Sequence, residues 1–268
     1  MAGDIWNAQQ YLKFADDRLR PFLDLVAQME TQEDARTVVD LGCGPGNATA
    51  LLADWWPEAR IVGVDSSPAM IDAAQQHAIP GRLEFELGDV REWQSAEKID
   101  VILANAVLQW VPGHLDLLGG LAAQLSPGGV FGFQVPGNFD APSHLALAEV
   151  KRNWTGRIPA DLERAASHDP AVYLERLVEA GLQPDVWETT YTHVIPSDPD
   201  PAVPCGVTDF VRGTALRPVV RALAEAVAAE FTAEYDKLVR VAYPVRELGG
   251  STVQLLPYRR IFAIGRAA

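Results

Sequence analysis

The sequence has few cysteines and no long apolar run. Only Cys43 and Cys205 occur among the 268 residues, and no cysteine or histidine pair has zinc-site spacing. Residues 1–20 are polar and charged, unlike a signal peptide. No apolar run approaches the roughly 18 residues of a membrane span. We therefore expect a cytoplasmic protein with no metal, no disulfide and no membrane association.

Basic residues are also scarce. Twenty-two Lys and Arg stand against 36 Asp and Glu, which gives a formal net charge of −14. Nucleic-acid binders usually present a basic face, so this balance argues against a nucleic-acid partner. An anionic small substrate would instead need a local cluster of arginines. With 48% hydrophobic residues the chain can bury a large core.

Strand and helix patterns alternate from residue 37 onward. Apolar runs at 37–41, 60–65, 82–87, 99–105 and 130–135 predict strands, and the patterns at 47–56, 68–77 and 113–125 predict helices. Residues 127–129, Pro-Gly-Gly, predict a turn. Such alternation indicates a parallel α/β sheet, whose ligands bind outside the carboxyl ends of the strands. Asp40, Asp65, Asp89 and Asn105 lie at those ends.

The alternation breaks after Pro136. We expect helices at 143–153 and 171–180, a strand at 186–195 and a Pro- and Asp-rich linker at 197–204. Residues 209–241 are mostly helical in pattern, and 259–265 predict a closing strand, antiparallel at or near the edge. The later segments therefore combine the end of the sheet with an inserted helical cap.

The strongest motif is DLGCGPGN at residues 40–47, where a strand leads through three alternate glycines into a helix. Glycine lets the backbone approach a ligand closely. Asn47 stands where a dinucleotide fingerprint has its third glycine. The negative charge of Asp40 would repel a phosphate but would attract a cation, such as the amino group of a methionine moiety. A tight turn without any ligand is the alternative.

Two further acids follow the next strands. Asp65 can accept hydrogen bonds from ribose hydroxyls, or it can cap the helix that begins near Ser66, Ser67 and Pro68. Asp89 can accept from an adenine amino group, with Val90 offering its backbone N–H to the ring. The Gly88–Val90 motif is weak alone and gains weight from its register with the other two.

These motifs, with 64–67 and 104–106, resemble the class I S-adenosylmethionine-dependent methyltransferases over residues 36–135. The resemblance implies a Rossmann-like seven-stranded α/β sheet with an antiparallel last strand and a mostly helical cap. It assigns the glycine loop to the methionine part of S-adenosylmethionine, Asp65 to ribose and Asp89 to adenine. The expected cofactor-binding set is Asp40, Gly42, Gly44, Gly46, Asp65, Ser66, Met70, Asp89, Val90, Asn105, Trp110 and Tyr11.

A longer resemblance, to trans-aconitate 2-methyltransferases, covers nearly the whole chain. It is carried by residues 11–14, 18–21, 105–112, 134–138, 142–144, 185–189, 213–218 and 257–262. Methyltransferases of biotin synthesis that act on a malonyl carrier protein also resemble the chain over 105–110. The domains expected on this basis are an N-terminal helical lid at 1–35, a cofactor-binding core at 36–136, 170–196 and 257–268, and a helical cap or substrate region at 137–169 and 197–256.

A tricarboxylate substrate needs cations, and guanidinium groups match carboxylates in two-point geometry. Candidates are Arg217, Arg259, Arg260 and Arg212. The adjacent pair faces opposite ways on a strand, so at most one of the two points inward. Arg212 and Arg217 have solvated surface positions as the alternative. Further expected substrate-binding residues are Tyr258, His144 and Gln109.

Several aromatic residues and two N-terminal arginines remain open in role. Trp110 and Tyr258 are expected to position the methyl group or substrate, and a buried packing role is the alternative for Trp110. Trp6, Tyr11 and Phe14 have roughly helical spacing, typical of a lid or of core packing. Arg18 or Arg20 is a candidate partner for the cofactor's carboxylate.

The expected reaction is O-methylation of a small tricarboxylic acid, with trans-aconitate favoured by resemblance. A carboxylate nucleophile is already ionised at pH 7, so no general base is required. The alternatives are methylation of a malonyl carrier protein and cofactor binding without catalysis. The sequence leaves the oligomeric state open.

Overall fold

The computed structural model describes residues 15–29, 35–159, 162 and 166–268. The chain divides into two compact units. Unit 1 comprises residues 1–136, 167–188 and 260–268, and unit 2 comprises 137–166 and 189–259. Two boundaries between these units, 188/189 and 259/260, fall inside the long strands β6 (Gln183–Pro196) and β8 (Ser251–Arg266). The domain limits expected from the sequence, at 169/170, 196/197 and 256/257, stay predictions. The roles assigned to the lid, core and cap stay predictions.

The sheet has the strand order β3-β2-β1-β4-β5-β8-β6, with the short β7 paired to β8. Neighbours from β3 to β5 pair in parallel, and β8 is antiparallel to β5. The expected seven-stranded Rossmann-like sheet with an antiparallel last strand is therefore confirmed, and β7 is an addition. The strands are β1 Thr37–Leu41, β2 Arg60–Asp65, β3 Leu83–Leu87, β4 Ile99–Asn105, β5 Leu125–Pro136, β6 Gln183–Pro196, β7 Arg246–Leu248 and β8 Ser251–Arg266.

Several predicted elements have different limits in the structure. The expected turn at 127–129 lies within β5, where Gly128 has a φ of +74° and the register with β4 shifts. The closing strand is longer than predicted, because β8 begins at Ser251. The predicted helix at 113–125 is a short 3-10 turn, η3 His114–Asp116, followed by α5 Leu117–Ala122.

The helical stretch predicted at 209–241 is three helices, α8 Gly206–Arg212, α9 Arg217–Ala222 and α10 Glu225–Ala242. Pro218 lies in the first turn of α9, where a proline starts a helix but cannot continue the previous one. The remaining helices are α2 Ala15–Gln28, α3 Asn47–Trp55, α4 Pro68–Ala74, η1 Gln75–His77, η2 Leu108–Trp110, α6 Pro142–Asn153 and α7 Pro170–Glu179. None of the described helices is both long and apolar enough to cross a membrane.

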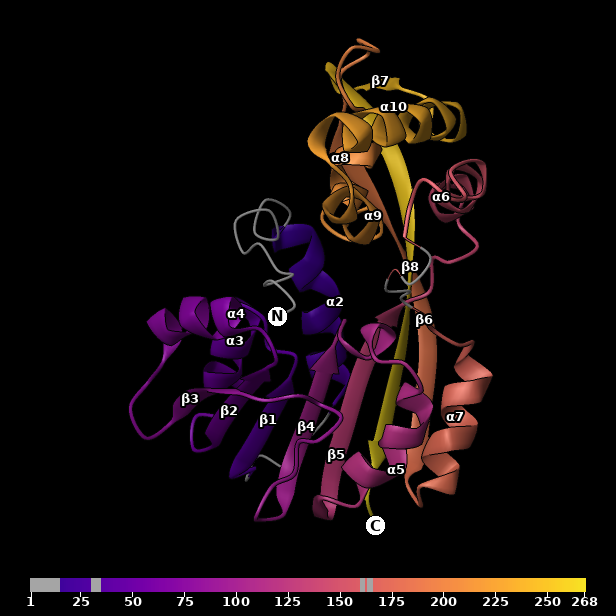
Figure 1. Ribbon diagram of the computed structural model, residues 1–268. Helices are drawn as coiled ribbons and strands as arrows, with labels where there is room; N and C mark the ends of the chain where they lie inside the picture. Colours follow the sequence, from indigo (N-terminus) through magenta and orange to yellow (C-terminus); the bar gives the residue numbers. More distant parts are fainter. Residues whose placement is uncertain (1–14, 30–34, 160–161, 163–165) are drawn as a thin grey trace. The chain divides into compact units, whose positions relative to one another are not determined.

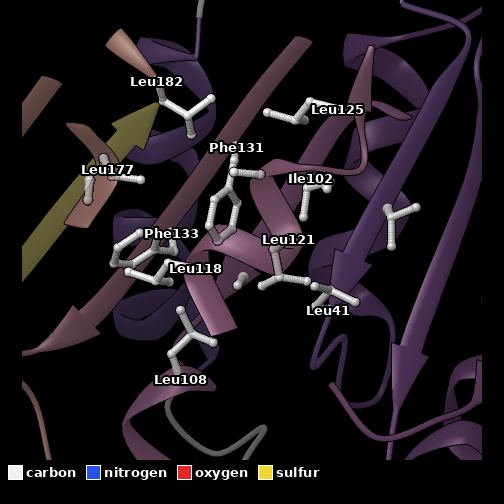
Figure 2. Close-up of a cluster of buried hydrophobic side chains, with 14 of the residues drawn as sticks. Leu41, Ile102, Leu108, Leu118, Leu121, Leu125, Phe131, Phe133, Leu177 and Leu182 are labelled. Atoms are coloured by element: carbon white, nitrogen blue, oxygen red, sulfur yellow. The ribbon is translucent and has the colours of Figure 1, made fainter. Parts of the chain in front are cut away.

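Helices cover both faces of the sheet in unit 1. Phe131 and Phe133 of β5 belong to one core with side chains of α5 and α7, among them Leu118, Leu121 and Leu177 (Figure 2). Gly132, between the two phenylalanines, points to the other face, where a Cβ would lie 2.5 Å from the Met29 sulfur. Since successive strand residues face opposite sides, α2 and the residue that follows it pack opposite α5 and α7.

The described part of the predicted lid packs on the sheet. Phe22, Leu25, Val26 and Met29 are buried at the spacing of one helical face, and α2 contacts β5. This burial explains why the segment forms an amphipathic helix. Whether residues 1–35 also act as a lid stays a prediction.

Unit 2 contains helices α6, α8, α9 and α10, the short strand β7, and the parts of β6 and β8 that lie within residues 189–259. Helix α10 packs against α6, α8 and α9, and these helices can be followed in Figure 1. The predicted linker at 197–204 is hydrogen-bonded to α10. Arg240 of α10 donates to the carbonyl oxygens of Asp198, Asp200 and Val203. Arg240 also pairs with Asp236 at 2.6 Å.

Candidate functional site

The glycine loop after β1 has the backbone conformation that its sequence predicts. Gly42, Gly44 and Gly46 all have positive φ, between +56° and +80°. A Cβ on Gly42 would lie 2.5 Å from Val107, whereas the corresponding space at Gly44 is open to 4 Å. The loop is held to β2 by the N–H groups of Gly42 and Cys43, which both donate to the carbonyl of Val64. The loop is therefore closed beneath Gly42 and accessible at Gly44.

Asp40 is a buried carboxylate below this loop, 2% exposed. Its Oδ2 accepts a 2.6 Å hydrogen bond from Thr49 of α3. Its Oδ1 has no hydrogen-bond partner among the described residues. The Asp40 pKa is raised to about 6, mainly by burial and in smaller part by the nearby Asp65 charge, while the Thr49 hydrogen bond acts in the opposite direction. A buried acceptor without a donor is costly, which suits this oxygen to a cationic ligand group.

Asp65 ends β2 and braces the same loop. Its Oδ2 accepts from the Gly44 N–H at 3.0 Å, and its Oδ1 accepts from the Ser67 N–H at 2.9 Å. Ser67, rather than Ser66, is the N-cap of α4, with its hydroxyl accepting from the Met70 N–H. Asp65 thus holds the glycine loop and the start of α4 through backbone N–H groups, and its ribose role stays a prediction. Ser66 is exposed and Met70 is buried.

Asp89 lies after β3 in a strong local ion pair. Arg91 contacts both carboxylate oxygens through Nε and Nη2, and its backbone N–H donates to Oδ1. These bonds to Arg91 hold the pKa of Asp89 below its usual value. Val90 is half-buried and packs against the core. An adenine amino group at Asp89 would therefore share this carboxylate with Arg91.

A row of polar side chains runs from the ends of β4 and β5 to the middle of β8, where Arg260 pairs with Pro136, the last residue of β5. Asn105 Oδ1 accepts a 2.8 Å hydrogen bond from Gln134 Nε2, and Arg260 Nη1 donates to Gln134 Oε1 at 3.4 Å. Gln134 and Arg260 are 1% and 6% exposed. Arg259, by contrast, is half-buried, and its backbone N–H donates to Asn138. Of the adjacent arginines, Arg260 is thus the more buried.

Residues 106–110 connect this row to the glycine loop through Val107. Ala106 has a φ of +54° and is the one non-glycine residue with positive φ in the described part of the chain. Gln109 Nε2 donates to the Ala106 carbonyl at 2.6 Å, while Gln109 Oε1 is buried without a described partner. That acceptor oxygen suits a donor group better than the substrate carboxylate predicted for Gln109. Trp110 is half-buried in η2.

The other predicted substrate residues belong to unit 2. Tyr258 is buried, with its ring against those of His193 and Phe210. Arg217 begins α9 and is 9% exposed, which does not fit the solvated alternative. Arg212 is half-buried at the end of α8.

His144 is also in unit 2, and Phe139 packs against its ring. Burial, with a smaller contribution from the Lys151 charge, lowers the His144 pKa to about 4. His144 is therefore neutral at pH 7, which weakens its case as a carboxylate partner.

Four predictions fall where the structure gives no side-chain information. Trp6, Tyr11 and Phe14 lie outside the described residues, as does the side chain of Arg18. Arg20 is exposed. Both cysteines are free and buried, and the described residues hold no group of three or more potential metal-ligating acids, histidines or cysteines.

The sequence reasoning missed two residues that the structure brings to the site. Thr49 lies on α3, nine positions after the Asp40 carboxylate that it bonds. Gln134 connects Asn105 to Arg260. A signal for Gln134 was present, because it is the lone polar residue in the apolar run 130–135.

Comparison with known proteins gives the chain a family context. The profile of a methyltransferase domain family matches residues 11–184. A protein of Streptomyces avermitilis named trans-aconitate 2-methyltransferase is 47% identical over 267 residues, covering 97% of this chain and 96% of the relative.

Two solved structures share the fold. The YcgJ protein of Bacillus subtilis has a TM-score of 0.61 at 14% identity, covering 92% of this chain and 98% of that one. Geranyl diphosphate C-methyltransferase of Streptomyces coelicolor, solved with Mg²⁺, geranyl diphosphate and S-adenosyl-L-homocysteine, has a TM-score of 0.52 at 14% identity, covering 93% and 77%.

Proposed function

The chain belongs to the trans-aconitate 2-methyltransferase family of S-adenosylmethionine-dependent methyltransferases, and we propose that it forms a methyl ester on a carboxylate of trans-aconitate. The observation that carries the cofactor part is Asp40, a buried carboxylate at the glycine loop, one oxygen of which has no hydrogen-bond partner among the described residues. The family name of relatives that match nearly end to end supports the substrate.

The residues of the loop fit the cofactor in kind. S-adenosylmethionine supplies a methyl group bound to a cationic sulfur. When the methyl group is transferred, the sulfur is the leaving group and keeps the bonding electrons. Asp40 would hold the amino group, and the open backbone side at Gly44 admits the methionine part. Asp65 would accept from the ribose hydroxyls, while Asp89 and Val90 would contact adenine. Asn105, Trp110 and Met70 complete the proposed cofactor set.

The chain's task toward the substrate is binding and orientation. Carboxylates titrate near 4, so the nucleophile is ionised at pH 7 and needs no base from the protein. Aligning nucleophile and methyl group can supply several kcal/mol of the barrier, roughly 7–11 at best. Two buried arginines are separate candidates for carboxylate binding, Arg260 in unit 1 and Arg217 in unit 2. Burial of an arginine on a chain of net charge −14 supports a role beyond solubility for each. Trp110 within unit 1 and Tyr258 within unit 2 are the corresponding candidates for orienting the substrate.

The reaction is tested by incubating the enzyme with methyl-labelled S-adenosylmethionine and a panel of acids. The panel contains trans-aconitate, cis-aconitate, citrate and a malonyl thioester on its carrier protein. We expect base-labile methyl ester from trans-aconitate foremost. Preferred labelling of the malonyl carrier would replace the proposed substrate, and binding of S-adenosylhomocysteine without label in any acid would leave only cofactor binding.

The substrate role of Arg217 has a matched control on the same helix. Arg221 is exposed on α9, so Arg221→Ala removes the same charge away from the buried position. We expect Arg217→Ala to raise KM for trans-aconitate by about tenfold or more, the lower end for a hydrogen bond to a charged group, with little change in cofactor affinity. Equal effects of the two variants on KM would remove Arg217 from the substrate site.

A further inference from the structure

Gln134 is a buried polar residue to which neither the motifs nor the comparisons assign a role. It lies in the otherwise apolar strand β5, 1% exposed, in register with Asn105 of β4 and Phe262 of β8. Its side chain bonds Asn105 on one side and Arg260 on the other. Its backbone carbonyl also accepts from the N–H of Ala106, the residue with positive φ.

The chemistry of the three side chains fixes the direction of these bonds. A guanidinium has only donors, so the Gln134 atom that faces Arg260 must be the carbonyl oxygen Oε1. The amide group of Gln134 therefore turns its Nε2 donor toward Asn105. Asn105 must answer with its acceptor Oδ1, as observed at 2.8 Å, and its Nδ2 donors are directed away from Gln134. The charge on Arg260 thereby sets the orientation of a side chain two hydrogen bonds away.

We propose that Gln134 is a positioning residue that holds the Arg260 guanidinium and fixes Asn105 with its N–H donors turned toward the carboxyl edge of the sheet. Asn105 would then recognise an acceptor, namely a carboxylate, either of the cofactor's methionine end or of the substrate. This inference rests on the proposed function for the ligand's identity. The hydrogen-bond direction itself depends only on the residues of unit 1.

Two substitutions of Gln134 separate its roles. Gln134→Met keeps the length and burial but removes both side-chain hydrogen bonds. Gln134→Glu keeps the acceptor for Arg260 but removes the donor, so Asn105 must rotate and present its Nδ2 to Glu, which leaves Oδ1 facing the ligand. Equal thermal midpoints for wild type and Gln134→Met would establish that the fold is retained, and Gln134→Glu supplies a second variant if one of them is unstable.

The readout independent of activity is the side-chain amide signals of Asn105 in a ¹⁵N-correlated NMR spectrum, assigned by their loss in Asn105→Asp. We expect Arg260→Met to shift these signals, although Gln134 stands between the two residues. The same substitution in a Gln134→Met background should leave them unchanged. Asn105 signals that do not change on Arg260→Met in the wild-type background would overturn the proposed direction of the hydrogen bonds from Arg260 through Gln134 to Asn105.

The kinetic readout identifies the carboxylate. We expect Gln134→Glu to weaken ligand binding by about tenfold, the scale of one lost hydrogen bond to a charged group, and Asn105→Asp to act in the same direction. A rise in Kd for S-adenosylhomocysteine identifies the cofactor's carboxylate, and a rise only in KM for trans-aconitate identifies the substrate's. Wild-type affinity for both ligands in Gln134→Glu would refute the positioning role, whereas a wild type that never methylates trans-aconitate would refute the proposed function and leave the NMR result standing.

Discussion

Cofactor binding should weaken in acid because of Asp40. In the ligand-free protein burial raises the pKa of this carboxyl to about 6. A cationic group bound at Oδ1 favours the ionised form, so binding lowers the pKa and releases a proton when the pH is below that value. The perturbation is therefore a change of pH from 7 to 5, with S-adenosylhomocysteine as the ligand because it retains the amino group.

The size of the effect follows from the pKa. If only ionised Asp40 binds the amino group, the apparent Kd is multiplied by 1 + 10^(pKa − pH), which is about 1.1 at pH 7 and about 11 at pH 5. The shift of roughly two pKa units also opposes folding of the free protein by about 3 kcal/mol above pH 6. That penalty disappears as the pH falls toward 3.8. At this site acid therefore removes the free-energy cost of the buried charge while it weakens cofactor binding.

Calorimetric titration at pH 5, 6 and 7, in two buffers of different ionisation enthalpy, measures both the affinity and the protons released. Thr49 supplies the matched pair of variants, since its hydroxyl donates to Asp40 Oδ2. Thr49→Val removes the bond that favours the ionised carboxyl, so the loss of affinity should begin at higher pH. Thr49→Ser keeps the hydroxyl and should resemble the wild type.

The reasoning fails if the affinity is flat between pH 5 and 7 and no proton is released. It also fails if Asp40→Asn shows the same pH dependence as the wild type, because another group would then be titrating. A Thr49→Val profile displaced to lower pH would contradict the assigned sign.

Three other predictions concern stability. Gly42→Ala should lower stability and cofactor affinity well beyond Gly81→Ala, which has a similar φ of +73° but open space instead of Val107 at 2.5 Å; equal thermal shifts would mean that Val107 moves aside freely. Ala106→Gly should leave stability unchanged or raise it by up to about 1 kcal/mol in denaturant titration, because a left-handed Ala is strained by roughly 1–2 kcal/mol and glycine gives back part of this in entropy; a clear loss would show that the Ala side chain stabilises the turn. Arg240→Ala should expose residues 198–204 to protease and destabilise unit 2 by about 2 kcal/mol, whereas Arg240→Lys keeps the charge but not the three carbonyl bonds and should restore little; unchanged proteolysis would show that the segment is held by other contacts.

The sequence by itself determined the elements whose signals are local. Strands β1, β2 and β4 have the predicted limits, because each is a short, mostly apolar segment that ends at a polar residue or leads directly into the glycine loop. The glycine loop was equally readable, since its three positive φ angles require the glycines that occupy them. The limits of α8, α9 and α10 were less accessible, because they depend on where Pro218 and the packing of α10 end each helix.

Only the tertiary structure decided which polar atoms meet. The sequence predicts adenine as the partner of Asp89, and only the structure shows that Arg91 also bonds this carboxylate. The sequence does not show which of the adjacent Arg259 and Arg260 faces inward, and the register of β8 with β5 buries Arg260. Gln134 meets partners 29 and 126 residues away. Hydrogen bonds between strands that are distant in sequence leave no local signature, because they depend on the order and register of the sheet rather than on the residues next to them.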